Sequence, residues 1–461
     1  MTQLKYKLIV KGTGFTSQSL TTVTVLEECL FFITEDGLIA KIIQKNQADY
    51  SELVAKYSQQ ANYYELAPGQ YLLPGMVDLH IHAPQWAQAG RALDLPLQDW
   101  LHQYTFPLEA KFADVDFADH VYRDLVEQLI ANGTTTGLYF ASIHEEASYR
   151  LAEICAEKGQ RGLVGKVVMD DHEQNPDFYR DGSTAEALAS TESFIQRVQQ
   201  LNKTTIQGVY PVVTPRFIPS CTDEALAGLG ALAKKYDVHI QSHCSESDWE
   251  HQYVADRFSK NDAFALNDFQ LLSEKAVMAH CNHLSLADRQ LFAETGTAIA
   301  ACPISNAYFA NGVLPIKEIT DQHKIDIGLG TDLSGGFSSS LFDNIKQSVI
   351  SSRMLEDGVD VALASNERGK ADSRITLNQA FYHGTAGGGQ ALSLPIGQLA
   401  EGYLWDALVI DTKLSSHPLP LFMADEDLLD VFQTIIYLSH SENIIKVWIH
   451  GETVKETKGA N

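Results

Sequence analysis

Two histidines stand two residues apart at the end of the apolar run PGMVDLHIH, residues 74–82. Side chains alternate between the two faces of an extended strand, so His80 and His82 point to the same side. Two neutral imidazoles so placed can share one metal ion, and imidazole is a common ligand of zinc and iron. The competing interpretation is a chance pair of histidines at the end of a half-buried strand. The secondary structure predicted around the two histidines decides between these interpretations.

Short apolar runs alternate with helical patterns through the middle of the chain, which is typical of βα units and a parallel sheet. Eight such runs can be counted, at Met76–His82, Thr134–Ile143, Leu163–Met169, Val209–Thr214, Val238–His243, Ala276–His280, Ala298–Cys302 and Asp326–Gly330. Helical patterns separate most of them, including Phe117–Ala131, Thr191–Leu201, Glu224–Tyr236 and Leu286–Thr295. Eight parallel strands with intervening helices predict an α/β fold of the (β/α)8 barrel type.

Both ends of the chain have a different, β-rich pattern. Apolar runs at Leu4–Lys11 and Val23–Thr34 precede the barrel, and the turn signal Glu35-Asp36-Gly37 follows the second one. Runs at Asp406–Asp411 and Ile444–His450 follow the barrel. We expect the two ends to pair in space. This predicts a discontinuous domain from residues 1–73 and 396–461 beside a catalytic barrel at residues 74–395.

Composition narrows the classes of partner and compartment. The net charge of −25 disfavours a nucleic acid polymer as partner, although it allows a neutral free base or nucleoside. We find no secretory signal and no apolar run of roughly 18 residues, so neither secretion nor a membrane span is expected. The six cysteines form no CxxC pair, and the HxE…PCxxC signature of small zinc deaminases is absent. Scattered thiols are typical of a reducing cytoplasm.

The barrel prediction places the chemically interesting side chains together, because active sites of this fold lie at the C-terminal ends of the strands. His80 and His82 end the first predicted strand, Arg216 follows the fourth, His243 ends the fifth, His280 ends the sixth and Asp332 follows the eighth. Chance histidines would not follow strand ends so consistently, which favours the metal site. We interpret His80, His82, His243 and Asp332 as ligands of one zinc or ferrous ion. A catalytic metal of this kind lowers the pKa of water to about 7.

Three side chains are candidates for proton transfer. Glu246 lies three residues beyond His243, where a carboxylic acid can protonate a substrate nitrogen and later the leaving group. His280 is expected to hydrogen-bond the attacking water, and Asp332 can serve both as ligand and as acceptor of its proton. The alternatives are a solvated loop glutamate for Glu246 and a core histidine for His280.

The residues after His82 and after the fourth strand indicate the substrate. The guanidinium of Arg216 matches O6 and N7 of guanine as paired donors to paired acceptors, and Phe217 can stack on a purine ring. The Gln85 amide can donate and accept along a base edge. We also expect His243 to contact the substrate. The alternative for Arg216 is an ion pair with an acidic residue.

Taken together, these motifs closely resemble those of the guanine deaminase family in the amidohydrolase superfamily, over nearly the whole chain. The segments that carry the resemblance are PGMVDLHIHAPQ (74–85), DLPLQDWLHQYTFPLE (94–109), GQRGLVGKVVMD (159–170), TPRF (214–217), HIQSHCSE (239–246), VMAHCNHLS (277–285), CPISN (302–306) and GLGTDLSGG (328–336). PGxxDxHxH and GTD are common to the superfamily, whereas HAPQ, DLPLxxWLxxYTFPxE and TPRF are more specific. Two places depart from the pattern: Trp405-Asp406 stands where the superfamily often has Ala-Asp, and residues 307–312 are less typical than their surroundings.

The resemblance implies a barrel beside a small β-sandwich built from both chain ends, one zinc per subunit with ferrous iron as the alternative, and usually a homodimer. It implies hydrolysis of guanine to xanthine and ammonia in guanine catabolism, with Glu246 as proton shuttle and Gln85 and Arg216 holding the base. Two other interpretations remain open. One is an aminohydrolase of another oxopurine, pterin or triazine; the other is a non-catalytic assembly protein, which would be expected to have lost ligands. Residues 94–109 either cover the pocket or pack as barrel-top structure.

Overall fold

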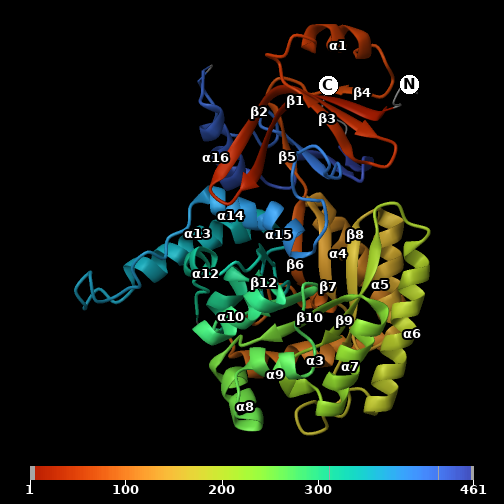
Figure 1. Cartoon of the computed structure of the whole chain (residues 1–461), viewed down its shortest axis with the longest axis vertical. Coiled ribbons are helices and arrows are strands. Elements are labelled where there is room, and N and C mark those ends of the chain that lie inside the picture. The colour runs from red at the N-terminus through yellow and green to blue at the C-terminus, as the bar shows by residue number, and fades with distance from the viewer. Residues whose placement is uncertain (1–5, 311, 424, 458–461) are drawn as a thin grey trace.

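The eight central runs form the parallel strands of one sheet in the computed structural model, which describes residues 6–310, 312–423 and 425–457 (Figure 1). These strands are β6 (Met76–His82), β7 (Thr134–Phe140), β8 (Arg161–Val168), β9 (Val209–Pro215), β10 (His239–Cys244), β11 (Ala276–His280), β12 (Ala298–Ala301) and β13 (Ile327–Leu329). Their order in the sheet is the order in the chain, and the sheet curls into a nearly closed barrel. The predicted fold class is confirmed.

Helices surround this barrel. They are α4 (Val115–Ala131), α5 (Glu145–Lys158), α6 (Thr184–Asn202), α7 (Asp223–Tyr236), α8 (Asp248–Phe258), α9 (Asp262–Asp268), α10 (Leu286–Thr295), α11 (Pro303–Ser305), α12 (Ile316–Gln322), α13 (Leu341–Asp357), α14 (Leu377–Gly384) and α15 (Ala386–Ala391). The helix α6 begins seven residues before the predicted Thr191, because Ser183 caps it by accepting a hydrogen bond from the Glu186 N–H. Among the described residues, no helix is long and apolar enough to cross a membrane.

Short helical segments lie over the C-terminal mouth of the barrel. After β6 the chain forms η1 (Ala83–Gln88), α2 (Leu97–Trp100), η2 (Leu101–Thr105), α3 (Phe106–Glu109) and η3 (Ala110–Ala113). Two more, η4 (Ile218–Ser220) and η5 (Asn306–Ala310), follow β9 and α11. These segments carry several of the side chains that line the site described below.

The two ends of the chain form a second sheet at the opposite end of the molecule from helix α8 (Figure 1). Its strands are β1 (Tyr6–Ser19), β2 (Thr22–Thr34), β3 (Ile39–Ile43), β4 (Tyr63–Glu65), β5 (Gln70–Pro74), β14 (Ala407–Asp411), β15 (Ile444–Ile449) and β16 (Glu452–Glu456), accompanied by α1 (Tyr50–Tyr57) and α16 (Leu428–Leu438). Strand β14 pairs antiparallel with β5, which joins the two ends as predicted. Residues 4–5 of the first predicted run lie outside the described residues. We propose that domain boundaries fall at 73/74 and 395/396.

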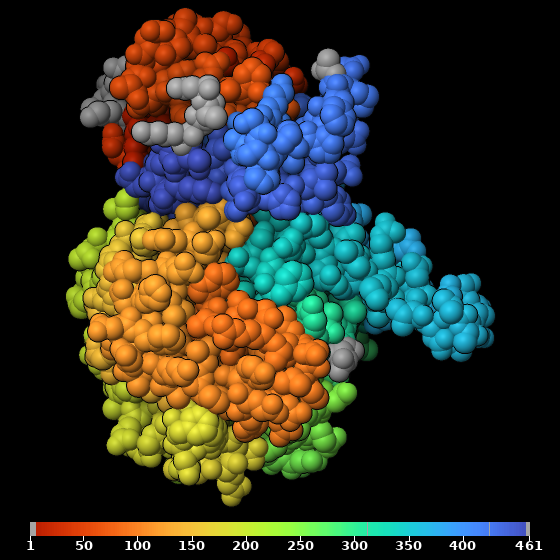
Figure 2. Space-filling view, turned by 180° about the vertical axis from the view of Figure 1, so that it is seen from behind, coloured from red at the N-terminus to blue at the C-terminus, as the bar shows by residue number. Residues whose placement is uncertain are grey.

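One segment projects away from both regions. The C-terminal part of α13 and the residues after it extend from the barrel as an arm, visible in cyan at the right of Figure 2. Its residues Val359, Val361 and Leu363 are 70%, 85% and 46% exposed. The arm therefore presents apolar side chains to the surroundings.

A buried ion pair fastens the barrel to the terminal sheet. Arg161 at the start of β8 donates to both carboxylate oxygens of Asp406, which immediately precedes β14. Asp406 also accepts hydrogen bonds from the backbone N–H groups of His450, at 2.8 Å, and, through its carbonyl, of Gly75, at 2.9 Å. The Arg161 and Asp406 side chains are 1% and 0% exposed. Removing one partner would leave an uncompensated buried charge.

We therefore expect Asp406→Asn to destabilise the protein by about 3–5 kcal/mol, because Arg161 keeps its charge and loses its counter-ion. The midpoint of urea unfolding, followed by circular dichroism, measures the effect. The matched control is Lys235→Met, which breaks the Lys235–Glu192 pair, whose side chains are 61% and 33% exposed, and should cost less than about 1 kcal/mol. Equal shifts of the midpoint in the two variants would contradict a joining role for the buried pair.

Candidate active site and metal centre

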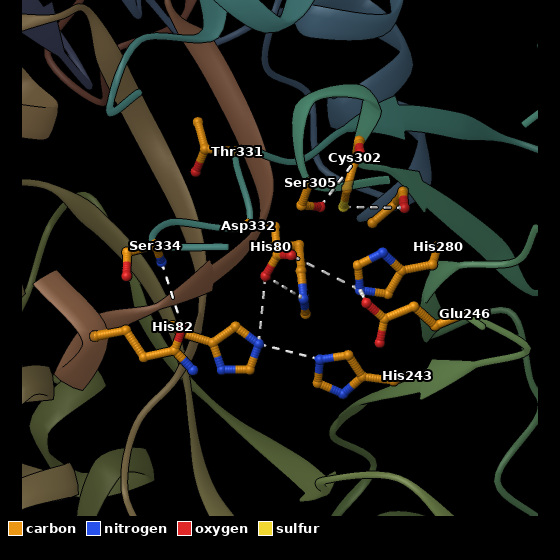
Figure 3. Close-up of polar contacts among 12 residues, drawn as sticks. His80, His82, His243, Glu246, His280, Cys302, Ser305, Thr331, Asp332 and Ser334 are labelled. Atoms are coloured by element: carbon orange, nitrogen blue, oxygen red, sulfur yellow. Dashed lines mark hydrogen bonds and ion pairs between the residues drawn. The ribbon is translucent and has the colours of Figure 1, made fainter. Parts of the chain in front are cut away.

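Five of the predicted side chains converge at the C-terminal mouth of the barrel (Figure 3). They are His80 and His82 at the end of β6, His243 near the end of β10, His280 as the last residue of β11 and Asp332 after β13. Each is at least 93% buried. The strand-end argument made from the sequence therefore agrees with the geometry.

The imidazoles of His80, His82 and His243 form the centre of the cluster. Ligand-type atoms of the three residues all lie within 4.8 Å of one another, and Nε2 of His82 is 3.0 Å from Nε2 of His243. Asp332 Oδ1 lies 3.2 Å from His80 Nε2 and 3.5 Å from His82 Nε2. Three nitrogens and one carboxylate oxygen so arranged are the donor set that zinc or ferrous iron prefers.

Burial keeps these imidazoles neutral. It lowers the pKa of His80, His82 and His243 well below the ordinary value, so their free lone pairs are available as ligands. His243 Nδ1–H donates to the carbonyl oxygen of Arg216 at 2.5 Å, which leaves the lone pair on Nε2. His80 Nε2 is buried and has no hydrogen-bond partner within the described ranges. A buried lone pair without a donor fits a metal ligand.

A second group of potential ligands shares His80. It adds His280 and Cys302, whose ligand atoms also lie within 4.8 Å of one another. Burial raises the pKa of the Cys302 thiol well above its ordinary value, and the thiol donates to the Ala300 carbonyl at 3.5 Å. Because thiolate, not thiol, binds metals, the group containing His82 and His243 is the better site.

The segment that carries Asp332 is held close against β6. Asp78 accepts hydrogen bonds from the backbone N–H of Thr331 at 3.0 Å and from its hydroxyl at 2.7 Å. The Asp332 N–H donates to the His80 carbonyl at 2.8 Å. A Cβ at Gly330 would lie 2.6 Å from the Cβ of His80, so only glycine permits this approach. Sequence reasoning did not assign a role to Asp78, although it lies within the first motif.

Glu246 lies in the loop after β10 and faces the cluster. Its Oε1 is 3.7 Å from His280 Nε2. Burial, and then the nearby charge of Asp332, raise the pKa of Glu246 to about 8. Its backbone is fixed on both sides, because its N–H donates to Glu250 Oε2 at 2.8 Å and its carbonyl accepts from Asn282 Nδ2 at 2.9 Å. The raised pKa favours the protonated form of this carboxyl group, from which it can donate a proton.

A hydrogen bond to Asn306 sets the orientation of the His280 imidazole. Its Nδ1–H donates to Asn306 Oδ1 at 2.9 Å, which turns Nε2 toward the site. That Nε2 is buried without a hydrogen-bond partner in the part of the chain that the structure describes, and lies 4.0 Å from Asp332 Oδ2. The alternative prediction for His280 is a histidine packed in the core. The residue is indeed buried, yet its Nε2 faces the cluster. Asn306, from the CPISN motif, was not predicted.

A cavity opens beside the cluster. It is lined by His82, Gln85, Leu97, Trp100, Leu101, Arg216, Phe217, His243, Glu246, Ser247, Trp249, Glu250, Phe309, Asp332 and Gly335. The residues predicted to contact the substrate, Gln85, Arg216, Phe217, His243 and Glu246, all line this cavity. Trp249 and Phe309 were not predicted, because these aromatic residues carry no metal-ligand or charge signal. Leu97, Trp100 and Leu101 line the cavity, so part of the 94–109 segment belongs to the pocket.

Arg216 reaches the cavity while engaged in an ion pair. Its NH1 and NH2 donate to the two carboxylate oxygens of Glu109, at 2.5 and 3.2 Å. Gln85 Nε2 donates to the same carboxylate at 3.0 Å. The sequence left open whether Arg216 contacts substrate or an acidic residue, and the geometry combines a buried ion pair with a place on the cavity wall. Glu109 ends the FPLE motif, which is the signal that could have identified it.

Comparisons with known proteins place this geometry in a family. Residues 71–454 match the amidohydrolase family. The chain is 36% identical to guanine deaminase of Dictyostelium discoideum, over 97% of this chain and 98% of that protein. It is 38% identical to guanine deaminase of Mus musculus, over 97% of this chain and 96% of that protein.

Among solved structures, the guanine deaminase from C. acetobutylicum with guanine bound in its active site superposes with a TM-score of 0.85. Its sequence is 31% identical, and the match covers 97% of this chain and 99% of that one. The sequence and structural matches thus agree over nearly the full length. The chain belongs to the amidohydrolase family and, within it, to the guanine deaminases.

Proposed function

We propose that this protein catalyses the hydrolytic deamination of guanine to xanthine and ammonia. The observation that carries the proposal is one cavity bordered by a histidine cluster, a buried carboxyl group of raised pKa and a guanidinium beside an amide. The relatives support it, since two are guanine deaminases and the solved structure holds guanine in its active site. The reaction class is hydrolysis of a C–N bond in a cyclic amidine.

His80, His82, His243 and Asp332 are the residues that would hold a divalent cation. Their neutral nitrogens and carboxylate oxygen suit zinc, and ferrous iron is the alternative. The unpartnered, buried His80 Nε2 supports the assignment. A cation bound there lowers the pKa of a water molecule to about 7 and so supplies hydroxide at neutral pH.

Glu246 and Asp332 transfer the protons between the water and the substrate. Glu246 donates to ring N3 of guanine as the water oxygen forms a bond to C2, and Asp332 accepts the proton that the water loses. His280 Nε2 lies where it can hydrogen-bond the added oxygen. Glu246 then takes up the proton of the added hydroxyl and passes it to the exocyclic nitrogen, because ammonia leaves only after protonation. The C2–N bond breaks with its electron pair on nitrogen, and the proton held by Asp332 restores Glu246. One water is consumed, and xanthine and ammonia are released.

Arg216, Gln85 and Phe217 hold the base in this scheme. The guanidinium and the amide donate to the O6 and N7 edge, and Phe217 stacks on the ring. Phe217 lies 5.9 Å from Trp249, and Trp100 lies 5.0 Å from Phe309, between ring centroids. These aromatic walls favour a flat ligand. His243 lines the same cavity and is positioned to contact the substrate beside the cation.

Zinc-loaded protein should release ammonia from guanine faster than from 8-oxoguanine, adenine, cytosine or a pterin. Guanine has acceptors at both O6 and N7 together with a 2-amino group, whereas N7 of 8-oxoguanine carries a proton, adenine lacks the 6-oxo group, and cytosine and a pterin have different ring systems. A coupled ammonia assay on this panel measures the preference. Activity confined to a pterin or to another compound of the panel would be consistent with the proposed deamination chemistry and would contradict the proposed recognition of guanine. No activity on any member by zinc-loaded protein would favour a non-catalytic role.

Glu246→Gln should lower kcat by about 10²–10⁴-fold, since an amide keeps the size of the side chain and cannot transfer the proton. Zinc per subunit, measured by atomic spectrometry, should stay at the parental level because Glu246 is not proposed as a ligand. The control variant is Glu224→Gln, a change at an exposed glutamate of α7. Near-parental turnover by Glu246→Gln would remove Glu246 from the mechanism.

We further propose that the protein is a cytoplasmic homodimer. All six cysteines are free and buried, which suits a reducing compartment. The exposed apolar side chains of the projecting arm, Val359, Val361 and Leu363, are typical of a protein interface, and a second copy of the chain is the partner proposed.

The double variant Val359→Asp/Val361→Asp should therefore sediment as a monomer where the parent sediments as a dimer, because two charges would be buried at the interface. Sedimentation velocity distinguishes the two states. Glu367→Gln, at an exposed position of the same arm, is the matched control and should stay dimeric. A parent that sediments as a monomer would contradict the proposal directly.

A further inference from the structure

Glu109 is a buried carboxylate that the proposed mechanism does not use. It is the last residue of α3, over the mouth of the barrel, and is 1% exposed. Its Oε2 accepts from Arg216 NH1 at 2.5 Å, and its Oε1 accepts from Arg216 NH2 at 3.2 Å and from Gln85 Nε2 at 3.0 Å. One carboxylate thus holds both of the polar side chains that face the base.

The contacts of Arg216 leave it little freedom. Besides the two-point ion pair, its NH1 lies 3.5 Å from the sulfur of Met169, and its guanidinium lies 5.1 Å from the ring centre of Phe106. The plane of the guanidinium is therefore set by Glu109 on one side and packed by apolar groups on the others. Its remaining N–H groups are those available to a ligand.

The same carboxylate determines how the Gln85 amide is presented. Because Gln85 Nε2 donates to Glu109, its Oε1 turns to the Ser334 N–H, which lies 3.4 Å away. Without an acceptor at Glu109 the amide could rotate by half a turn and exchange its donor and acceptor. The carboxylate thereby fixes which atom of the amide meets the base.

The charge of the pair has a further consequence. A lone buried guanidinium is a strong site for anions, such as carboxylate or phosphate. Here Glu109 cancels that charge within hydrogen-bond distance, so an entering anion would face the Glu109 carboxylate as well as the guanidinium. A neutral ligand with oxo and ring-nitrogen acceptors meets no such repulsion.

We infer that Glu109 is a positioning and specificity-determining residue, which makes Arg216 and Gln85 one neutral recognition unit that selects neutral oxopurines over anionic ones. The inference rests on the proposed function, since it specifies the substrate class of the same cavity. It also gives the buried ion pair and the base contact of Arg216 a single explanation.

The test compares Glu109→Gln with the parent, both zinc-loaded. The KM for guanine should rise by about tenfold or more because charge-assisted hydrogen bonds are lost. Zinc content and the pH profile of kcat should not change, since Glu109 touches neither the ligands nor Glu246 by the contacts described. Equilibrium binding of urate, an anion at neutral pH, should strengthen in the variant, whereas binding of neutral hypoxanthine should weaken.

Two more variants guard against a merely structural effect. Glu109→Asp keeps the negative charge but moves the carboxylate away from Arg216 and Gln85. It should therefore weaken the binding of hypoxanthine without strengthening the binding of urate. Glu109→Gln/Arg216→Met removes both charges and should abolish the gain for urate. If Glu109→Gln does not fold, Glu109→Asp decides the matter, because hypoxanthine binding at the parental level, or tighter urate binding, would overturn the inference. Glu192→Gln, in an exposed pair with Lys235, is the matched control and should change the binding of neither ligand.

The inference would be overturned if Glu109→Gln weakened the binding of urate and of hypoxanthine equally, or if it left the KM for guanine unchanged. Its failure is distinguishable from failure of the proposed function. If the parent releases no ammonia from guanine, the function fails, while the opposite responses of urate and hypoxanthine binding still report on Glu109. A parent that binds neither purine would overturn both.

Discussion

The carboxylate of Asp78 ties the first barrel strand to the segment that follows the last one, and the site depends on this tie. Its hydrogen bonds to Thr331 bring β6 and the residues after β13 side by side. His80, two residues along β6, and Asp332, one residue beyond Thr331, thereby come within 3.2 Å of each other. Donors separated by some 250 positions in the chain can share a cation only because the barrel closes here.

Cancellation of charge is the second constraint on this site. Burial lowers the pKa of the three central histidines and raises that of Glu246, so the buried groups adopt their neutral forms. Arg216 cannot lose its proton, and its charge is instead balanced by Glu109. The result is a cavity with directed donors and acceptors and little net charge on the wall that would hold the base. This matches a planar, neutral, polar substrate better than a phosphate or a carboxylate.

Several of the cavity walls come from segments that also depart from simple secondary structure. Trp100 ends α2 and packs on Phe309 from η5, which lies within the stretch that departs from the family pattern. The other departure is Trp405, which precedes Asp406, and the carboxylate of Asp406 joins the barrel to the terminal sheet. Neither departure alters the cluster of His80, His82 and His243. One adjusts the pocket wall, and the other belongs to the junction of the two sheets.

Periodicity and strand-end position determined much of this protein from sequence alone. They placed eight parallel strands, joined the β-rich ends and put His80, His82, His243, His280 and Asp332 at one mouth, because a barrel leaves its C-terminal strand ends on one side. Tertiary structure decided the rest. The pairing of Glu109 with Arg216 crosses 107 positions, and Trp100 and Phe309 meet across segments without a periodic pattern. No local pattern encodes such contacts; they follow from how the loops pack over the barrel and from the need to pair each buried charge.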